Sequence, residues 1–580
     1  MANPTDKPLI VQSDHTLLLE VVHALADEAR ESILPFADLL KSPEHVHTYR
    51  ISPLSLWNAS ASGLGADEVL ERLEAYSRYA LPANLIVEIR TQMDRYGLVE
   101  LLPGPKGEIH LHVRDEQAAS EVFLEPTIRP FLLDEGNGDA RTRRVAAGNR
   151  GEVKIALTSI GFPARDLVGF VEGDKMEMSL RETMTGGAPF QLRNYQKAAV
   201  EAFYQNGSPE GGQGIVVLPC GAGKTIIGIA AMARLGVRTL ILVTNTVAAK
   251  QWIREILDKT GLTKDDVGEY DGSSKEVRAV TVATYQILIY RRKKDAAFPH
   301  MDLFRRENWG LIIYDEVHVL PAPIFRATSE IQSRRRLGLT ATLVREDGRE
   351  TDVFSLIGPK RYELPWRDLE SKGWIAEAHC YEVRVPLPND VRAHYASADK
   401  RRKYRVAAEN PLKEEVVQRI LARHVGDHVL VIGGYLSQLR SLAWATGAPL
   451  ITGQTPAAER EILYDRFRRG DIRILVVSKV ANFAVDLPEA NVAIQVSGAF
   501  GSRQEEAQRL GRILRPKAAD TRFYSLVTSH TSEQEFALKR QLFLTEQGYH
   551  YNVIDLESPE AIEGHLEAGK PADPGWVSTT

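Results

Sequence analysis

The sequence predicts an α/β protein with two parallel-sheet lobes flanked by helices, preceded by a helical, winged-helix-like domain and a small strand-rich domain. Strand and helix patterns alternate in two blocks, 186–365 and 366–555, which predict the lobes. The most informative stretch is an apolar run over 214–217, a glycine turn and a helical pattern over 226–235. That order of strand, turn and helix is what a phosphate-binding loop requires.

The glycine turn carries the residue types expected of such a loop. It consists of Leu218, Pro219, Cys220, Gly221, Ala222, Gly223, Lys224 and Thr225. The glycines let backbone N–H groups face a polyphosphate. Lys224 can reach the outer phosphates, and the Thr225 hydroxyl can ligate Mg²⁺. Leu218 departs from the usual G-x-x-x-x-G-K-[ST] pattern, so a chance Gly-x-Gly-Lys-Thr in a flexible turn is the alternative interpretation.

Two carboxylates follow a second buried-strand pattern. The run 309–314 ends on Asp315 and Glu316. Beside a phosphate loop, Asp315 can complete a metal site and Glu316 can orient or deprotonate the attacking water. Two acidic residues after a strand are usually a solvated turn. The pairing with the loop favours the catalytic interpretation.

The composition is that of an ordinary globular protein. The chain has 580 residues, of which 43% are hydrophobic and 26% charged, and a formal net charge of -5. This length predicts three or four domains. The charge excludes a global basic field, so nucleic-acid contact would need local basic surfaces. Two cysteines exclude a disulfide framework, and the absence of a signal pattern or a long apolar stretch predicts a cytoplasmic protein without membrane association.

Residues 1–120 are predicted to form the first domain. Helical patterns cover 17–30, 67–78 and 82–96, and apolar runs at 98–102 and 109–113 flank a Pro/Gly turn that is typical of a hairpin. Such a module binds DNA or protein. Because this one is not strongly basic, we favour a protein-contact or packing role. Residues 121–185 are predicted to form the small domain, with short strands over 153–157 and 167–171.

Polar side chains follow the strand patterns of the first lobe. They are Thr246, Thr284, Thr340 and Thr342. Hydroxyls at strand ends suit the phosphate oxygens of a nucleic acid, but they equally suit helix capping. Upstream of the loop, Gln196 can donate and accept at once, so it can read an adenine edge. An ordinary helix-surface glutamine is the alternative.

The second lobe has no phosphate loop and carries arginines instead. Arg509, Arg512 and Arg515 recur at three-residue spacing, so they share one helix face. That face can bring arginine fingers to a phosphate held by the other lobe, and surface salt bridges are the alternative. A basic run comprises Lys400, Arg401, Arg402, Lys403, Tyr404 and Arg405. It predicts either a backbone-gripping projection or a solvated helix face.

The order of these motifs resembles that of a superfamily 2 helicase. The matching stretches are Gln196, 221–225, Asp-Glu-Val-His at 315–318, Thr-Ala-Thr at 340–342 and 508–515. Arg345, Glu346 and Asp347 resemble the Arg-Glu-Asp element of XPB-type helicases. Segments 478–488 and 501–506 are similar to that family's second lobe, 161–164 and 169–173 look like its small damage-recognition-like domain, and 53–59 resembles its N-terminal domain.

The resemblance implies a prokaryotic, DNA-dependent ATPase that moves 3′ to 5′ and binds ATP and Mg²⁺ between two RecA-like lobes, with a repair role by analogy. It implies nucleotide contacts from Arg193, Gln196 and Asp486, and metal contacts from Thr225 and Asp315. Contact with DNA, or coupling to it, is implied for Thr246, Thr284, Thr340, Thr342, Arg345, Glu346, Asp347, Arg401, Arg402, Lys403 and Gln508. Arg401, Arg402 and Lys403 are expected to belong to a thumb-like insert. Residues 556–580 are expected to form a tail.

The expected partners are single-stranded and forked DNA, and a repair nuclease or another protein could bind the N-terminal domain. Two alternatives to a helicase stay open. One is a duplex translocase that does not separate strands, and the other is a non-enzymatic ATP-gated DNA clamp or scaffold. DNA-stimulated phosphate release distinguishes the clamp from both motors, and strand displacement distinguishes the motors from each other.

Overall fold

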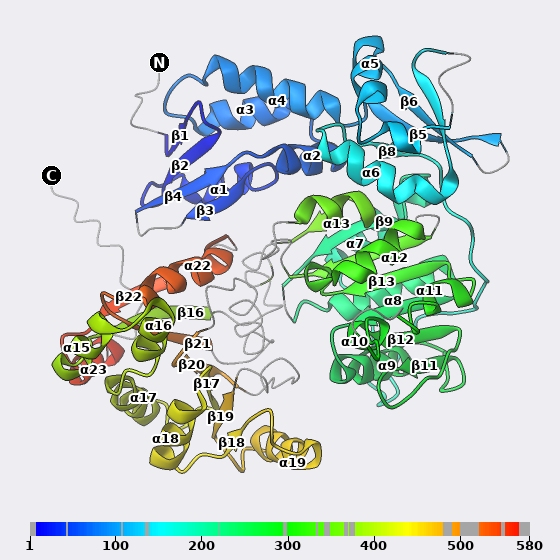
Figure 1. Ribbon diagram of the computed structural model, residues 1–580. Coiled ribbons are helices and arrows are strands. Elements are labelled where there is room, and N and C mark those ends of the chain that lie inside the picture. Colours follow the sequence, from blue (N-terminus) through cyan, green and yellow to red (C-terminus); the bar gives the residue numbers. More distant parts are fainter. Residues whose placement is uncertain are drawn as a thin grey trace. The chain divides into compact units, whose positions relative to one another are not determined.

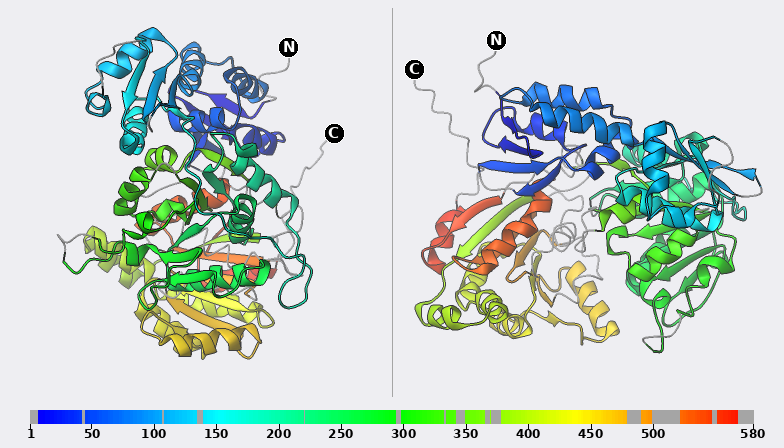
Figure 2. Two further views of the ribbon diagram at one scale, coloured as in Figure 1. Left: turned by 90° about the vertical axis from the view of Figure 1, so that its right-hand side faces the viewer. Right: turned by 45° about the horizontal axis from the view of Figure 1, so that its top comes forward.

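The computed structural model describes residues 7–41, 45–105, 108–133, 139–219, 221–293, 298–331, 334–341, 349–364, 369, 378–478, 490–498, 521–546 and 551–567. The chain divides into two compact units. The first comprises residues 1–218 and 223–364, and the second comprises residues 365–580 together with the turn 219–222. Figure 1 shows both units with elements labelled where there is room, and Figure 2 shows two further views.

The first unit begins with a four-stranded antiparallel sheet in the order β1-β2-β4-β3. Its strands are β1 (Leu9–Val11), β2 (Thr16–Glu20), β3 (Asp38–Lys41) and β4 (Val46–Arg50), and its helices are α1 (Ala26–Ile33), α2 (Pro53–Ala61), α3 (Ala66–Tyr76) and α4 (Ala83–Arg95). Helices α3 and α4 confirm two of the predicted helices. The helix predicted over 17–30 was wrong in its first half. Leu17 and Leu19 are buried between half-exposed neighbours, which is strand periodicity.

A second small sheet follows, in the order β7-β6-β5-β8. It contains β5 (Val99–Pro103), β6 (Ile109–Val113), β7 (Thr142–Val145) and β8 (Arg165–Asp166), with helices α5 (Glu116–Leu124) and α6 (Arg150–Ser159). The predicted hairpin is confirmed by antiparallel pairing of β5 with β6, but its sheet extends across residue 120. The strand predicted over 153–157 was wrong, because Val153 and Leu157 are four residues apart on the buried face of α6. The strand predicted over 167–171 was also wrong, since pairing with β5 ends at Asp166.

Helix α6 joins this small domain to the lobe that follows. Asp166 accepts hydrogen bonds from Arg150 Nη2 at 2.7 Å and Lys154 Nζ at 3.1 Å, and all three side chains are buried. One turn further along the same face of the helix, the Ser355 hydroxyl donates to Thr158 Oγ1 at 2.8 Å. Buried polar groups satisfied in this way favour one packing arrangement.

The remainder of the first unit is a seven-stranded parallel sheet in the order β11-β12-β10-β13-β14-β9-β15. Its strands are β9 (Gln213–Val217), β10 (Thr239–Val243), β11 (Val267–Tyr270), β12 (Val280–Thr284), β13 (Leu311–Asp315), β14 (Arg335–Thr340) and β15 (Lys360–Glu363). Its helices are α7 (Asn194–Tyr204), α8 (Lys224–Leu235), α9 (Thr246–Lys259), α10 (Tyr285–Leu288), α11 (Leu303–Arg306), α12 (Ala322–Glu330) and α13 (Glu350–Leu356). Strands β9, β10 and β12 are buried along their whole length, which explains their unbroken apolar runs.

The second unit contains another seven-stranded parallel sheet, in the order β18-β19-β17-β20-β21-β16-β22. Its strands are β16 (Ala378–Val385), β17 (Val429–Gly433), β18 (Leu450–Ile451), β19 (Ile474–Ser478), β20 (Val492–Gln495), β21 (Thr521–Thr528) and β22 (Tyr551–Asp555). Its helices are α15 (Asn389–Ser397), α16 (Lys400–Ala408), α17 (Leu412–Arg423), α18 (Leu436–Thr446), α19 (Ala457–Arg468), α22 (Ser532–Glu546) and α23 (Ile562–Glu567). Counted from its own first strand, each large sheet has the order 3-4-2-5-6-1-7. The predicted pair of parallel-sheet lobes is therefore confirmed.

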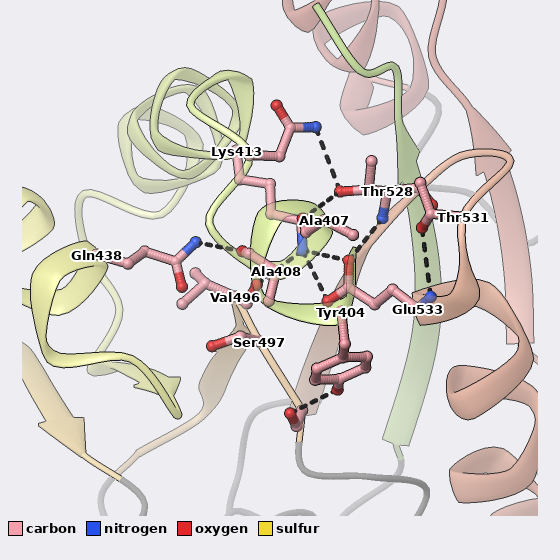
Figure 3. A network of polar contacts seen from close by, with 12 residues as sticks. Tyr404, Ala407, Ala408, Lys413, Gln438, Val496, Ser497, Thr528, Thr531 and Glu533 are labelled. Atoms are coloured by element: carbon pink, nitrogen blue, oxygen red, sulfur yellow. Dashed lines mark hydrogen bonds and ion pairs between the residues drawn. The ribbon is translucent and has the colours of Figure 1, made fainter. Parts of the chain in front are cut away.

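A fully buried ion pair organises the second unit (Figure 3). Lys413 Nζ lies 2.7 Å from Glu533 Oε2, and both side chains are 0% exposed. Lys413 also donates to the carbonyl of Val496 at 3.0 Å, and the Thr528 N–H donates to Glu533 at 2.9 Å. Tyr404 donates its hydroxyl to the Gly498 carbonyl at 2.7 Å. These bonds tie α16, α17 and α22 to the ends of β20 and β21.

We expect Lys413→Met to destabilise the second unit by about 3–5 kcal/mol, because it leaves Glu533 as an uncompensated buried charge. The double change Lys413→Met/Glu533→Leu should cost less than the sum of the two single changes. Hydrogen exchange of the β20 and β21 amides measures the effect locally. Arg405→Ala, which removes one partner of the exposed pair with Glu409, is the control and should change little. Equal exchange in Lys413→Met and this control would contradict the prediction.

Candidate nucleotide and nucleic-acid site

The phosphate loop lies between β9 and α8, at the carboxyl edge of the first large sheet. Gly221 has φ 83° and Gly223 has φ 81°, in the left-handed region that favours glycine. A Cβ at position 223 would stand 2.7 Å from Gln196 Nε2. Leu218, which replaces the first glycine of the usual pattern, is 0% exposed and donates its N–H to the Thr340 carbonyl at 2.9 Å. The backbone at Leu218 therefore continues the pairing of β9 with β14, and its side chain packs in the core.

Lys224 and the two predicted carboxylates converge at this edge. Lys224 Nζ lies 3.3 Å from Glu316 Oε1, with the two side chains 10% and 18% exposed. Glu316 directly follows β13 and has φ 52°, which is uncommon for a residue other than glycine. His318 Nδ1 lies 3.5 Å from Glu316 Oε2 and 2.7 Å from Thr340 Oγ1, so it joins the end of β13 to the end of β14. The pairing of β9, β13 and β14 brings these groups together.

The surroundings of Asp315 and Glu316 shift the pKa values of these two neighbouring carboxyl groups in opposite directions. Burial, and then the charge of Glu316, raise the pKa of Asp315 to about 6, against a hydrogen bond from Trp252 Nε1 to Asp315 Oδ2 at 2.9 Å. Burial also raises the pKa of Glu316, but Lys224 and His318 outweigh it, so that pKa is lowered. Glu316 is consequently held in the charged form that a base or water-orienting group requires.

These residues fit ATP with Mg²⁺. Glu316 Oε2 is buried and makes no hydrogen bond with any described residue, so it can still accept one. The positive-φ glycines, the cation of Lys224 and the carboxylate of Asp315 add the donors and the oxygen ligand that a magnesium–polyphosphate needs.

Gln196 and Arg193 lie at the start of α7. Gln196 is 5% exposed, and its Oε1 accepts the Arg193 N–H at 2.9 Å. Gln196 is therefore packed against the loop through Gly223, and the helix-surface interpretation is excluded. The nucleotide contacts expected of Gln196 and Arg193 stay predictions.

The threonine hydroxyls predicted to contact nucleic acid are engaged inside the protein. Thr246 donates to Asp271 Oδ2 at 2.9 Å. Thr284 is 2% exposed and caps α10 by accepting the Ile287 N–H at 3.4 Å, as the capping alternative predicted. Thr340 is 0% exposed and bonds to His318. Any nucleic-acid contact of these turns would have to come mainly from their backbone N–H groups.

The basic run forms helix α16. Arg402 is largely exposed, and its Nε lies 3.4 Å from Asp399 Oδ2. The Lys403 ammonium lies 5.5 Å from the centre of the Tyr395 ring. Tyr404 is 2% exposed, so it anchors the helix and leaves a solvated basic face. The side chains of Lys400 and Arg401 lie outside the described part, as do Cys220, Thr342, Arg345, Glu346, Asp347, Asp486, Gln508, Arg512 and Arg515.

Sequence reasoning missed the side chains that hold Asp315 and Glu316 in place. Trp252 and Tyr285 are buried, and the Tyr285 hydroxyl donates to the Asp315 carbonyl at 3.0 Å. In the sequence both are aromatic residues in apolar surroundings, a pattern that does not distinguish them from ordinary core residues. His318 appeared only as part of a motif. No signal in the sequence assigned any of these three side chains a partner.

Three family models match the chain. The ERCC3/RAD25/XPB C-terminal helicase model matches residues 369–568, the helicase conserved C-terminal domain model matches 9–136, and the model of the type III restriction enzyme res subunit matches 189–345. The DNA 3'-5' helicase XPB of Mycobacterium tuberculosis is 53% identical over 555 residues, which is 95% of this chain and 98% of the relative. The chain belongs to the XPB helicase family.

Two other XPB proteins show how far the similarity extends. The DNA 3'-5' helicase XPB of Kineococcus radiotolerans is 52% identical over 98% of this chain and 100% of the relative. The general transcription and DNA repair factor IIH helicase/translocase subunit XPB of Encephalitozoon cuniculi is 34% identical over 96% of this chain and 84% of the relative. The resemblance drawn from the motifs is thus confirmed. Among the described helices, none has the length and apolar character needed to cross a membrane.

We expect Lys224→Ala to abolish ATP hydrolysis, because it removes the flexible cation of the phosphate loop. Glu316→Gln should keep ATP binding while turnover falls by about 10²–10⁴-fold, the usual contribution of a general base. Phosphate release and nucleotide binding are measured on the same preparations. Lys264→Ala, at an exposed lysine of the same lobe, is the control. Normal turnover in Glu316→Gln would show that its role is wrongly assigned.

Proposed function

We propose that this protein is an ATP-dependent 3′–5′ DNA helicase that couples ATP hydrolysis to translocation and duplex opening in DNA repair. The observation that supports it most directly is the Lys224–Glu316 contact of 3.3 Å at the carboxyl edge of a parallel sheet, in a chain of the XPB family. A cation and a partly buried carboxylate with a lowered pKa form a site for phosphoryl transfer to water.

Each residue of the site has a defined task in this proposal. ATP with Mg²⁺, when bound, supplies the phosphoryl group and a Lewis acid. Lys224 and the loop N–H groups bind the outer phosphates, and Thr225 and Asp315 hold the metal. Glu316 orients the attacking water and accepts its proton. The remaining nucleotide-site residues are Arg193, Gln196, Leu218, Pro219, Cys220, Gly221, Ala222, Gly223 and Asp486, and the arginine fingers are Arg512 and Arg515.

The domains divide the work. Residues 186–365 hold the nucleotide, and 366–555 supply the arginines and, through Arg401, Arg402 and Lys403, a basic grip on the DNA backbone. Thr246, Thr284, Thr340, Thr342 and Gln508 belong to turns and a helix that couple DNA to the cleft. Residues 1–120 contact a protein partner such as a repair nuclease, 121–185 form the damage-recognition-like domain, and 556–580 are a tail. The protein works in the cytoplasm.

The test compares ATP hydrolysis and strand separation on duplexes with 3′ tails, 5′ tails and blunt ends. A 3′–5′ helicase unwinds the 3′-tailed duplex and hydrolyses ATP faster when DNA is present. ATP hydrolysis stimulated equally by all three duplexes, without unwinding, would identify a duplex translocase. DNA binding without stimulated phosphate release would identify a clamp, and either outcome would refute the helicase proposal.

Replacing Arg345, Glu346 and Asp347 together by alanine should leave most DNA-stimulated ATP hydrolysis but sharply reduce strand separation. Carboxylates repel a phosphate backbone, so this element would act where the strands part, while Lys224 and Glu316 carry out the hydrolysis. Both activities are measured on one forked duplex. Parallel loss of the two activities, or undiminished unwinding, would refute this role.

A further inference from the structure

The candidate metal ligand Asp315 is held by a buried tryptophan. Trp252, on α9, is 1% exposed and donates its indole N–H to Asp315 Oδ2 at 2.9 Å. An indole has one donor and no acceptor, so the bond favours the charged form of the carboxylate. It also restrains rotation of the carboxylate, because it fixes the position of one of the two oxygens.

Trp252 is itself tightly located. A Cβ at Gly228, on α8, would stand 2.5 Å from Trp252 Cη2, so the indole lies directly on the backbone of the helix that follows the phosphate loop. Helix α9 begins at Thr246, where Asn245 accepts the Ala248 N–H at 2.9 Å and Thr246 donates to Asp271. The same rigid helix therefore starts at a polar strand-end turn and reaches Asp315.

Ordinary core packing does not require this partner. Trp309, equally buried in the same lobe, donates its indole N–H to the backbone carbonyl of Leu303 at 2.8 Å. A neutral carbonyl therefore satisfies a buried indole in this protein. Trp252 instead donates to the Asp315 carboxylate, and the Tyr285 hydroxyl donates to the backbone carbonyl of the same residue. The partners of Asp315 thus come from α9 and α10, both of which begin at strand-end turns.

We propose that Trp252 is a positioning residue that orients the Asp315 carboxylate for the metal and links it to α9. The proposal rests on the proposed function, since it takes Asp315 as a ligand of Mg²⁺. Partners that orient a ligating side chain typically contribute 10–100-fold to metal affinity or activity. Trp252 touches neither nucleotide nor metal in this role and acts only through Asp315.

The experiment measures Mn²⁺ affinity of the full chain by electron paramagnetic resonance, in the presence of a non-hydrolysable ATP analogue. Trp252→Phe keeps the ring packing but removes the donor, and it should weaken Mn²⁺ binding by about tenfold or more. Trp309→Phe, the matched control, should bind Mn²⁺ like the wild type. In EDTA, the wild type and both variants should bind the ATP analogue with the same affinity. A variant that had lost its structure would bind the analogue more weakly, so this measurement distinguishes a local effect on the metal from unfolding.

Equal Mn²⁺ affinity in Trp252→Phe and Trp309→Phe would overturn the positioning role. If the wild type bound no Mn²⁺ with the analogue, the proposed nucleotide site itself would fail. Should Trp252→Phe not fold, Gly228→Ala moves the indole without changing it, because the added methyl meets Trp252 Cη2. It too should weaken Mn²⁺ binding, and normal affinity there would overturn the proposal.

Discussion

The contact between Lys224 and Glu316 is the constraint on which the first lobe depends. Asp315 and Glu316 are adjacent, partly buried and of like charge, an arrangement that is unfavourable without compensation. Lys224 compensates Glu316, while Trp252 donates to Asp315. These partners come from α8 and α9, so the carboxylates can stay charged only when both helices are packed on the sheet. The packing of α8 and α9 on the sheet is therefore needed both for the fold and for the charged carboxylates.

The two large sheets share one strand order but differ at their carboxyl edges. In the first, that edge bears the phosphate loop and the carboxylates. In the second, a fully buried Lys413–Glu533 pair fastens α17 and α22 to the ends of β20 and β21. A buried pair of this kind adds little net stability compared with apolar packing, but it strongly penalises any arrangement in which one partner is lost. The ends of β20 and β21 are thus held in one arrangement.

The sequence predicted the elements with a strong local signal and missed those defined by distant partners. Strands β9, β10, β12 and β13 are unbroken apolar runs, and the loop has glycine at both left-handed positions. Strand β16 contains charged residues, among them the buried Glu382, which accepts a hydrogen bond from the distant Gln541 side chain as well as one from its neighbour Arg384 on the same strand. Likewise, Trp252 could be recognised as a core residue but not as a partner of Asp315, which lies 63 residues away. Local periodicity carries no information on such contacts.

The strand-end threonines show how a position can be predicted while the partner of its side chain is not. Their positions at strand ends were predicted, but Thr284 caps α10 and Thr340 bonds to His318, so these hydroxyls point into the protein. A nucleic acid bound at these turns would then meet chiefly backbone N–H groups, which contact phosphates without regard to base sequence. A motor that must move along any sequence needs contacts of that kind. The same elements also reach the carboxylates. Thr340 bonds to His318, which lies beside Glu316, and Trp252 on α9 donates to Asp315. The turns at the strand ends and the two carboxylates are therefore held by one set of contacts.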